Sequence, residues 1–330
     1  MKCAVVAKHG DALDNLVIEE RPDPSPGDNE IAVAVAATAL NRADLLQRRG
    51  LYPAPPGLAD GVRDIPGLEF AGTVDALGKN VTRWRRGERV LGILAAGGYA
   101  SRLVTHEELV LRVPEGLSNT EAAAVPEAFV TAFDALVLQA GMTAGERVLI
   151  HAVASGVGTA AVQLVNAWGA EAIGTAGSED KLKKVAALAP LFPVNYGTTD
   201  FKNAIEARYR DNAVDIVLDL IGASYWMANL SLLRTGGRLV LVGRLGGSDA
   251  QTPLGLLMTK RLRIMGTVMR SRTLAEKISV TRAFGEQVLP LFGKRVLKPV
   301  VDSVYPFAEI REATAKMERN ENVGKIVLEF

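Results

Sequence analysis

The stretch HAVASGVGTAA, from His151 to Ala161, has the residue types that a phosphate-binding turn needs. It lies between a strand-like run and a helical pattern, which is where such turns occur. Gly156 and Gly158 have no Cβ and let the backbone approach a phosphate, while Ser155 offers a hydroxyl to a cofactor oxygen. Val157 lies in the first helical turn, whose dipole attracts an anion. The loop therefore predicts a dinucleotide site, with a tight turn that binds no ligand as the alternative.

The residues about 20 positions further on distinguish NADH from NADPH. An NADH site usually has a carboxylate there for the ribose 2′-hydroxyl, but this chain has Gly177, Ser178 and Lys181. A hydroxyl and a cation suit a 2′-phosphate, and Tyr196 offers a second hydroxyl. Glu179-Asp180 fits the first turn of a helix capped by Ser178 and can point away. The pattern favours NADPH, with a surface Lys181 and a core Tyr196 as the alternatives.

The elements that must position these residues form two kinds of pattern. Residues 1–124 alternate strand-like runs with Gly, Pro and Asp clusters, which is typical of a β-barrel. From 125 to 270 strand-like and helical runs alternate, which predicts a parallel, doubly wound sheet. Residues 271–330 become strand-like again and are predicted to rejoin the first domain. The fold class is therefore α/β, with a β-barrel domain and a Rossmann-type domain. The predicted strands of the second domain are Val148–Ala152, Ala172–Thr175, Pro193–Asn195, Val214–Leu218, Arg238–Val242 and Leu262–Val268.

Composition excludes several classes of protein. The 330 residues are 48% hydrophobic and 23% charged with a net charge of +1, so neither nucleic acid nor a membrane is expected as a partner. No apolar run reaches the roughly 18 residues of a membrane span. The single cysteine, Cys3, excludes an intrachain disulfide and indicates a cytoplasmic protein. One Cys and three His cannot build a Cys-rich zinc site, so no metal is expected.

Motifs in both predicted domains carry a family resemblance. They are Ala39–Asp44, Leu51–Pro53, Pro66–Gly72, Val125–Ala128, Thr175–Ser178, Ile221–Trp226 and Asn322–Val327. Together they resemble the zinc-independent quinone oxidoreductases of the medium-chain dehydrogenase/reductase superfamily, over essentially the whole chain. They are most similar to the tumour-suppressor-inducible NADPH:quinone oxidoreductase subgroup, with zeta-crystallin more distant. The resemblance implies a GroES-like barrel, a Rossmann domain and a return to the barrel, with the cofactor in the cleft between the domains.

One departure from the superfamily bears on the chemistry. The zinc alcohol dehydrogenases have a His before the Glu of a Gly-His-Glu motif, and in Gly67-Leu68-Glu69 this position is Leu68. Without zinc to polarise a carbonyl, oxidation of simple alcohols is not expected. A quinone needs less help, because it accepts hydride readily and its product anion is delocalised. Positioning it against the nicotinamide can then suffice.

The resemblance also implies roles for individual residues near the reacting groups. Asn41 and Thr131 line the nicotinamide end of the cofactor, and Ser155 lies at the cofactor beneath it. Tyr52 lies at the mouth of the substrate pocket and hydrogen-bonds or protonates the reduced oxygen. The alternatives are a turn residue for Asn41, a packing residue for Thr131 and, for Tyr52, a surface aromatic in the Pro-rich loop that includes residues 53–57.

Two further residues complete the predicted site. Gly243 ends a strand at the crevice where such sheets bind ligands, and Asn322 reaches the cofactor from the C-terminal segment. The predicted catalytic residues are Tyr52, Asn41 and Ser155. The predicted cofactor-binding residues are Asn41, Thr131, Ser155, Gly156, Val157, Gly158, Ser178, Lys181, Tyr196, Gly243 and Asn322.

The function predicted from these residues is zinc-independent hydride transfer from NADPH to a quinone or another conjugated carbonyl. By resemblance the protein is expected to be a homodimer, joined at the edge strand Leu262–Met269. Two alternatives remain open. One is an enone or enoyl-thioester reductase with the same cofactor site. The other is a weakly catalytic NADPH-binding protein that acts as a redox sensor, a structural protein or an RNA-binding protein.

Overall fold

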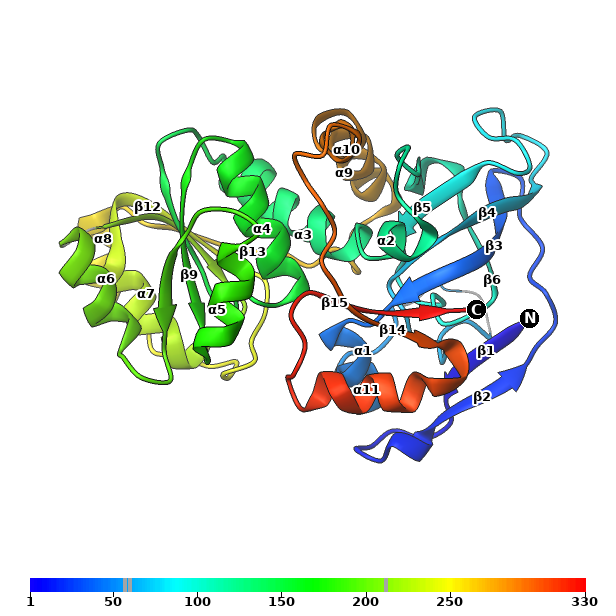
Figure 1. Cartoon of the computed structure of the whole chain (residues 1–330), viewed down its shortest axis with the longest axis horizontal. Helices are drawn as coiled ribbons and strands as arrows, with labels where there is room; N and C mark the ends of the chain where they lie inside the picture. The colour runs from blue at the N-terminus through cyan, green and yellow to red at the C-terminus, as the bar shows by residue number, and fades with distance from the viewer. Residues whose placement is uncertain (56–57, 59–60, 211–212) are drawn as a thin grey trace. The chain divides into compact units, whose positions relative to one another are not determined.

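The protein, seen in a computed structural model, consists of two compact units. The structure describes residues 1–55, 58, 61–210 and 213–330. One unit contains Met1–Val130 and Met269–Phe330, and the other contains Thr131–Val268 (Figure 1). The limits predicted from the sequence, after residues 124 and 270, fall a few residues from these. Pro56 and Gly57 of the predicted Pro-rich loop lie outside the described residues.

The first unit contains a two-stranded sheet and a larger, barrel-like sheet. β1 pairs with β2, and the larger sheet has the order β14-β15-β3-β4-β5-β7, with β6 also paired to β3. The strands are β1 (Lys2–Val6), β2 (Leu16–Glu20), β3 (Glu30–Ala39), β4 (Glu69–Leu77), β5 (Arg89–Ile93), β6 (Arg102–His106), β7 (Val110–Arg112), β14 (Val301–Pro306) and β15 (Lys325–Glu329). The helical segments are η1 (Leu13–Asn15), α1 (Arg42–Arg48), η2 (Glu107–Leu109), α2 (Asn119–Ala123), η3 (Pro126–Val130), α9 (Leu274–Gln287), α10 (Leu289–Gly293), η6 (Phe307–Glu309) and α11 (Ile310–Glu318).

The long strand β3 connects the parts of this unit. Its alternating side chains Ile31, Val33 and Val35 point to one side and pack in a buried cluster with Phe70 and Trp84. Burying each such side chain stabilises the fold by about 1.5–3 kcal/mol. β15 pairs antiparallel with the end of β3 and parallel with β14, as Figure 1 shows. The C-terminal strand β15 is therefore part of the larger sheet of the first unit.

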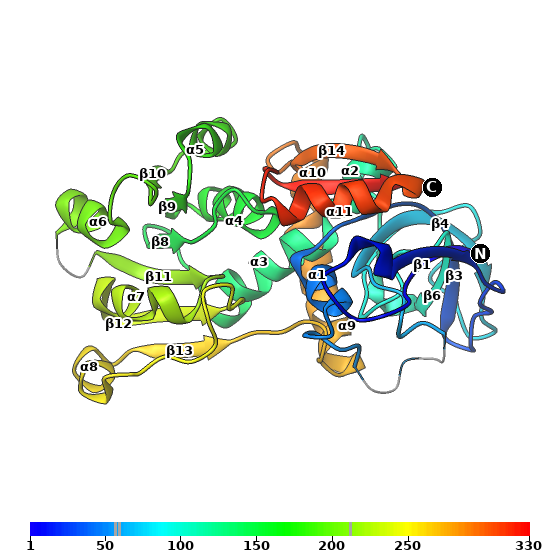
Figure 2. The ribbon, with the colours of Figure 1, turned by 90° about the horizontal axis from the view of Figure 1, so that it is seen from below.

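The second unit is a six-stranded sheet with helices, and all its strand pairs are parallel. Its order is β10-β9-β8-β11-β12-β13, which Figure 2 shows in succession. The strands are β8 (Arg147–Ile150), β9 (Glu171–Ala176), β10 (Phe192–Asn195), β11 (Val214–Asp219), β12 (Leu233–Leu241) and β13 (Arg263–Gly266). The helical segments are α3 (Thr131–Phe133), η4 (Asp134–Gln139), α4 (Gly156–Ala167), α5 (Glu179–Ala186), α6 (Phe201–Tyr209), η5 (Ala223–Tyr225), α7 (Trp226–Leu232) and α8 (Leu254–Lys260). The predicted Rossmann-type sheet is confirmed.

The strand order of the second unit defines a place for a ligand. The chain proceeds outward from β8 through β9 to β10 and then returns to β11, on the other side of β8. Open α/β sheets bind ligands beyond the carboxyl ends of their strands at such a switch point. The glycine loop follows β8, so it lies at this point. In the described part of the chain no helix is long and apolar enough to cross a membrane.

Candidate active site

The glycine loop forms the turn predicted from the sequence. Ser155 is the N-cap of α4, and its Oγ accepts a hydrogen bond from the Gly158 N–H at 3.0 Å. The Ser155 hydroxyl therefore keeps its own hydrogen to donate to a ligand. A Cβ on Gly158 would lie 2.5 Å from the Ala152 carbonyl oxygen. Gly158 thus allows the helix to pack against the loop, while the first helical N–H groups, at Gly156 and Val157, have no partner within the helix.

A second set of predicted residues gathers after β9 and β10. Ser178 caps α5 by accepting the Lys181 N–H at 3.4 Å, which confirms the predicted cap. A Cβ on Gly177 would lie 2.9 Å from the Tyr196 Oη, so this glycine lets the phenol lie against the turn. Tyr196 remains 43% exposed. Two hydroxyls and the start of a helix that contains Lys181 therefore surround one turn, a donor set that suits a phosphate.

The remaining predicted residues of the second unit have backbone or packing positions. Thr131 begins α3 and is only 8% exposed. Gly243 follows β12, and its N–H donates to the Asp219 carbonyl oxygen at 3.2 Å. Gly243 therefore lies beside the carboxyl end of β11.

The carboxyl ends of the same strands also carry a buried polar network, which is not part of the site predicted from the sequence. His151 is fully buried, with Nδ1 2.9 Å from Thr175 Oγ1 and Nε2 2.7 Å from Asn229 Oδ1. Asn229 in turn donates to Asp219 Oδ2 at 3.1 Å. Desolvation lowers the pKa of His151, which favours the neutral ring. The network connects the ends of β8, β9 and β11, and nothing in the sequence pattern singles out Asn229.

In the first unit, Asn41 is held by a buried ion pair. The Lys325 Nζ lies 2.7 Å from Glu69 Oε1 and donates to Asn41 Oδ1 at 2.5 Å and to the Leu40 carbonyl oxygen at 2.7 Å. Asn41 Nδ2 donates to Glu69 Oε1 at 2.9 Å and to the Ala39 carbonyl oxygen at 3.2 Å. Both amide hydrogens are used, so Asn41 can offer a ligand only a remaining lone pair on Oδ1.

Glu127 joins this network through its backbone. Its N–H donates to Glu69 Oε2 at 2.8 Å. Burial of the Glu127 carboxyl, together with the negative charge of Glu69, raises its pKa to about 8. Glu127 belongs to the Val125–Ala128 motif and Lys325 to the Asn322–Val327 motif, so the sequence contained a signal for both.

Tyr52 rests on a buried arginine that the sequence analysis did not identify. The Arg270 guanidinium lies 4.7 Å from the centre of the Tyr52 ring, and its Nη1 donates to the Tyr52 carbonyl oxygen at 2.9 Å. Nη2 donates to Gln47 Oε1 at 2.5 Å, and Nε donates to the Ala95 carbonyl oxygen at 2.6 Å. Arg270 is 6% exposed and forms no ion pair with a carboxylate of the described chain. Desolvation and the charge of Glu127 raise the pKa of Tyr52, and the charge of Arg270 lowers it.

The side chain of Asn322, shortly before β15, is buried and makes use of only part of its hydrogen-bonding capacity within the described chain. Its Nδ2 donates to the Gly324 carbonyl oxygen at 2.8 Å. Its Oδ1 is buried and has no hydrogen-bond partner among the residues that the structure describes. A buried polar atom without a partner costs about 1–3 kcal/mol. This oxygen is therefore available to accept a hydrogen bond from a ligand.

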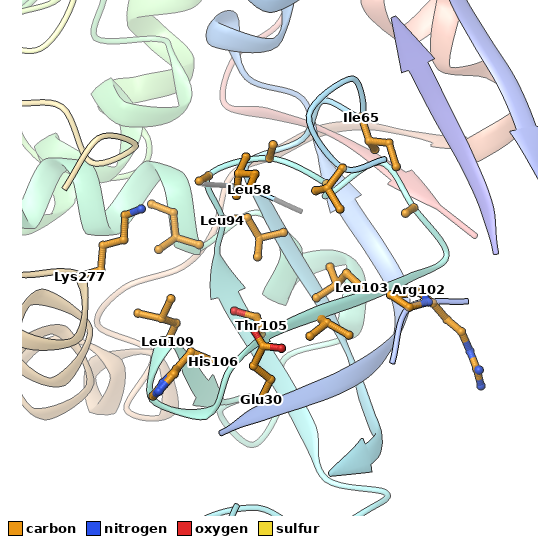
Figure 3. A pocket seen from close by; sticks show the side chains of 18 of the residues that line it. Glu30, Leu58, Ile65, Leu94, Arg102, Leu103, Thr105, His106, Leu109 and Lys277 are labelled. Atoms are coloured by element: carbon orange, nitrogen blue, oxygen red, sulfur yellow. The ribbon is translucent and has the colours of Figure 1, made fainter. Parts of the chain in front are cut away.

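A cavity of about 430 Å³ lies in the first unit (Figure 3). Most of its lining is apolar, with contributions from β5, β6, the loop at 94–97 and α9. Ala95, whose carbonyl oxygen accepts from Arg270, forms part of the wall, and so does Met269. One guanidinium therefore connects the cavity wall to the backbone of Tyr52.

The residues present do not suit zinc. Leu68 is buried and has no donor atom, and the Glu69 carboxylate is already paired with Lys325. Cys3 is buried in β1, with its Sγ 3.7 Å from the Glu19 carbonyl oxygen. Across the described ranges, no group of three or more His, Cys, Asp or Glu side chains could hold a metal ion.

The chain matches two sequence families, which follow one another along the sequence. Residues 27–115 match the alcohol dehydrogenase GroES-like domain, and residues 156–283 match the family described as zinc-binding dehydrogenase. Human quinone oxidoreductase is 30% identical over 92% of this chain and 90% of its own length. The crystal structure of Escherichia coli quinone oxidoreductase complexed with NADPH is similar with a TM-score of 0.88 and 27% identity, over all of both chains. The CurK enoyl reductase structure has a TM-score of 0.87 and 30% identity, over 99% of this chain and 98% of that one.

The fold and the site define an NAD(P)-binding oxidoreductase with a GroES-like domain and a Rossmann domain. The chain belongs to the medium-chain dehydrogenase/reductase superfamily, in the family of the quinone oxidoreductases.

Proposed function

We propose that the protein reduces quinones with NADPH and without zinc. The observation that carries the proposal is the contact of Tyr52 with the buried Arg270, which forms no direct ion pair with a carboxylate of the described chain. A preorganised cation stabilises negative charge that develops on a reduced oxygen, which is the task that zinc performs in the metal-dependent relatives. A quinone, whose product anion is delocalised, can react with this weaker assistance.

The second unit supplies the cofactor site in this proposal. Ser155 and the first turn of α4 bind the pyrophosphate, with the Ser155 hydroxyl donating. Ser178, Lys181 and Tyr196 bind the 2′-phosphate, which selects NADPH over NADH. When bound, NADPH supplies the hydride.

The first unit supplies the residues that act on the substrate. Tyr52 donates a proton to the reduced oxygen, and Arg270 holds the tyrosine in place. The Glu69–Lys325 pair fixes the Asn41 amide, so Asn41 presents its oxygen in one orientation. Asn322 accepts a hydrogen bond through Oδ1.

The test is consumption of NADPH and NADH, measured side by side with an ortho-quinone and a metal chelator. The proposal predicts chelator-resistant turnover that is much faster with NADPH. Equal rates with both cofactors would contradict the assignment of the 2′-phosphate site. Tight NADPH binding without turnover of any acceptor would instead favour a binding or sensor function.

An enoyl-thioester or enone reductase is the second candidate. It is favoured by the similarity to the CurK enoyl reductase and by the apolar cavity, whose wall Arg270 connects to the backbone of Tyr52. A panel of quinones, enones and acyl thioesters separates the two candidates, since kcat/KM measures discrimination between substrates directly.

We also infer a homodimer joined at β13. This strand lies at the end of the sheet order, and Ile264 and Val268 on the segment are 36% and 48% exposed. An unpaired edge strand is able to pair with a second copy. Light scattering should give the mass of a dimer, and Ile264→Pro should convert it to a monomer because proline removes a ladder N–H. A monomeric wild-type protein would contradict the inference.

A further inference from the structure

The ionisable groups around the cavity differ in whether they already have a hydrogen-bond or ion-pair partner. The ionisable groups that line it are the Met1 amino group, Glu30, Arg102, His106 and Lys277. Four of them already have partners. The Met1 amino group pairs with Asp23, and Arg102 pairs with Asp23 and Asp75. Glu30 accepts the Gly27 N–H, and His106 accepts the Glu108 N–H.

Lys277 is the exception. Its ammonium forms no hydrogen bond or ion pair with any residue in the part of the chain that the structure describes. The neighbouring carboxylate, Glu276, is occupied by the backbone and hydroxyl of Thr273. Figure 3 shows Lys277 on α9 at one side of the cavity, whereas Arg102 extends away from it at the other.

Lys277 is also destabilised in its charged form. Partial burial and the charge of Arg270 both lower its pKa. Two positive charges, Lys277 and Arg270, therefore lie near each other. Arg270 forms no direct ion pair in the described chain, although the carboxylates of Asp44 and Glu127 act on its charge from further away. A half-buried cation beside apolar side chains is compensated when a ligand brings an anion to it.

We propose that the cavity binds the apolar body of a negatively charged substrate and that Lys277 pairs with the charge. The substrate class is then an anionic conjugated carbonyl, such as a quinone or enone that carries a carboxylate or sulfonate. The identification of the ligand as the substrate rests on the proposed function. Its reactive end would lie near Tyr52, because Arg270 connects that residue to the cavity wall at Ala95.

The first experiment measures binding and does not depend on turnover. Two fluorescent probes share an apolar ring system, but only 8-anilino-1-naphthalenesulfonate has a charge, whereas N-phenyl-1-naphthylamine is neutral. Each is titrated into wild-type protein, Lys277→Met and Lys294→Met. Methionine keeps an unbranched apolar stem, and Lys294 is an exposed lysine outside the cavity lining, so its variant is the matched control.

The proposal predicts that Lys277→Met weakens the sulfonate probe about 10-fold or more, as expected for loss of one charge-assisted hydrogen bond. Affinity for the neutral probe should change less than about two-fold, and Lys294→Met should change neither. Equal weakening of both probes, or no effect on either, would overturn it.

The second experiment compares 1,2-naphthoquinone with its 4-sulfonate as substrates. Lys277→Met should raise KM for the sulfonate about 10-fold with kcat unchanged, and should leave the parent quinone unaffected. Unchanged KM values for both quinones would overturn the role of Lys277 while leaving the quinone reductase proposal intact. If wild-type protein reduces neither quinone, the proposed function fails, and the probe titration still decides whether Lys277 binds an anion.

Discussion

Replacing Lys325 with methionine should destabilise the first unit more than any surface change. The variant removes the ammonium from a fully buried carboxylate, Glu69, and leaves the Leu40 carbonyl and Asn41 Oδ1 without their donor. Breaking a buried ion pair typically costs about 3–5 kcal/mol. Glu69 keeps hydrogen bonds from Asn41 Nδ2 and the Glu127 N–H, so we expect a cost near the lower end, at about 3 kcal/mol.

The assay must report on the first unit alone. Of the three tryptophans, Trp84 is buried in the β3–β4 cluster of this unit, and Trp168 and Trp226 belong to the other. In a Trp168→Phe, Trp226→Phe background, urea unfolding followed by fluorescence therefore measures the free energy of unfolding of the first unit.

Two further variants make the result decisive. Adding Glu69→Gln to Lys325→Met should recover at least about 1 kcal/mol, because the uncompensated charge is gone. Lys79→Met is the control, since the Lys79–Asp28 pair is exposed and its loss should cost no more than about 0.5 kcal/mol. A cost of less than about 1 kcal/mol for Lys325→Met would show that the buried ion pair does not stabilise the first unit as expected. A double variant no more stable than the single one would show the same.

Three other variants test the site. Lys181→Ala should weaken NADPH binding about 10-fold or more and leave NADH binding unchanged in titrations of both cofactors, whereas the exposed Lys184→Ala should affect neither; equal losses would remove Lys181 from the 2′-phosphate. Tyr52→Phe should lower kcat about 100-fold, the size of a general-acid contribution, with little effect on NADPH affinity; an unaltered kcat would reduce Tyr52 to a wall residue. The raised pKa of Glu127, about 8, means that the folded state loses stability as pH rises from about 4.5 through about 8, because ionisation is easier in the unfolded chain. Glu127→Gln should therefore raise Tm more at about pH 9 than at about pH 5, and an equal rise at both would contradict the shift.

The sequence predicted the second unit best. The parallel strands, the turn before α4 and the cap at Ser178 all follow from local patterns, namely short apolar runs, small residues and a hydroxyl before two acidic residues. Gly177 follows β9 and Tyr196 follows the neighbouring strand β10. Because the two strands are parallel, the sequence could place both residues at the same edge of the sheet.

In the first unit, the contacts around Arg270 and Glu69 could not be predicted from the sequence. Arg270 stands in an ordinary basic stretch, and its partners Gln47, Tyr52 and Ala95 are distant in sequence. The ion pair of Glu69 with Lys325 is likewise a product of strand pairing, since β15 must lie beside β3 before the two side chains can meet. Spacing along a chain carries no information about contacts of this kind.

The position of β15 has a consequence for folding during synthesis on the ribosome. The second unit is one continuous segment, so it is complete while the ribosome is still adding the last strand of the first unit. Until β15 arrives, the end of β3 is an open edge, and Glu69 has no cation beside it. A chain truncated before Lys325 would therefore present an exposed strand and an unpaired acid, features that favour aggregation or degradation. Lys325, whose ammonium holds Glu69 and Asn41 in place, is therefore synthesised only after the whole second unit.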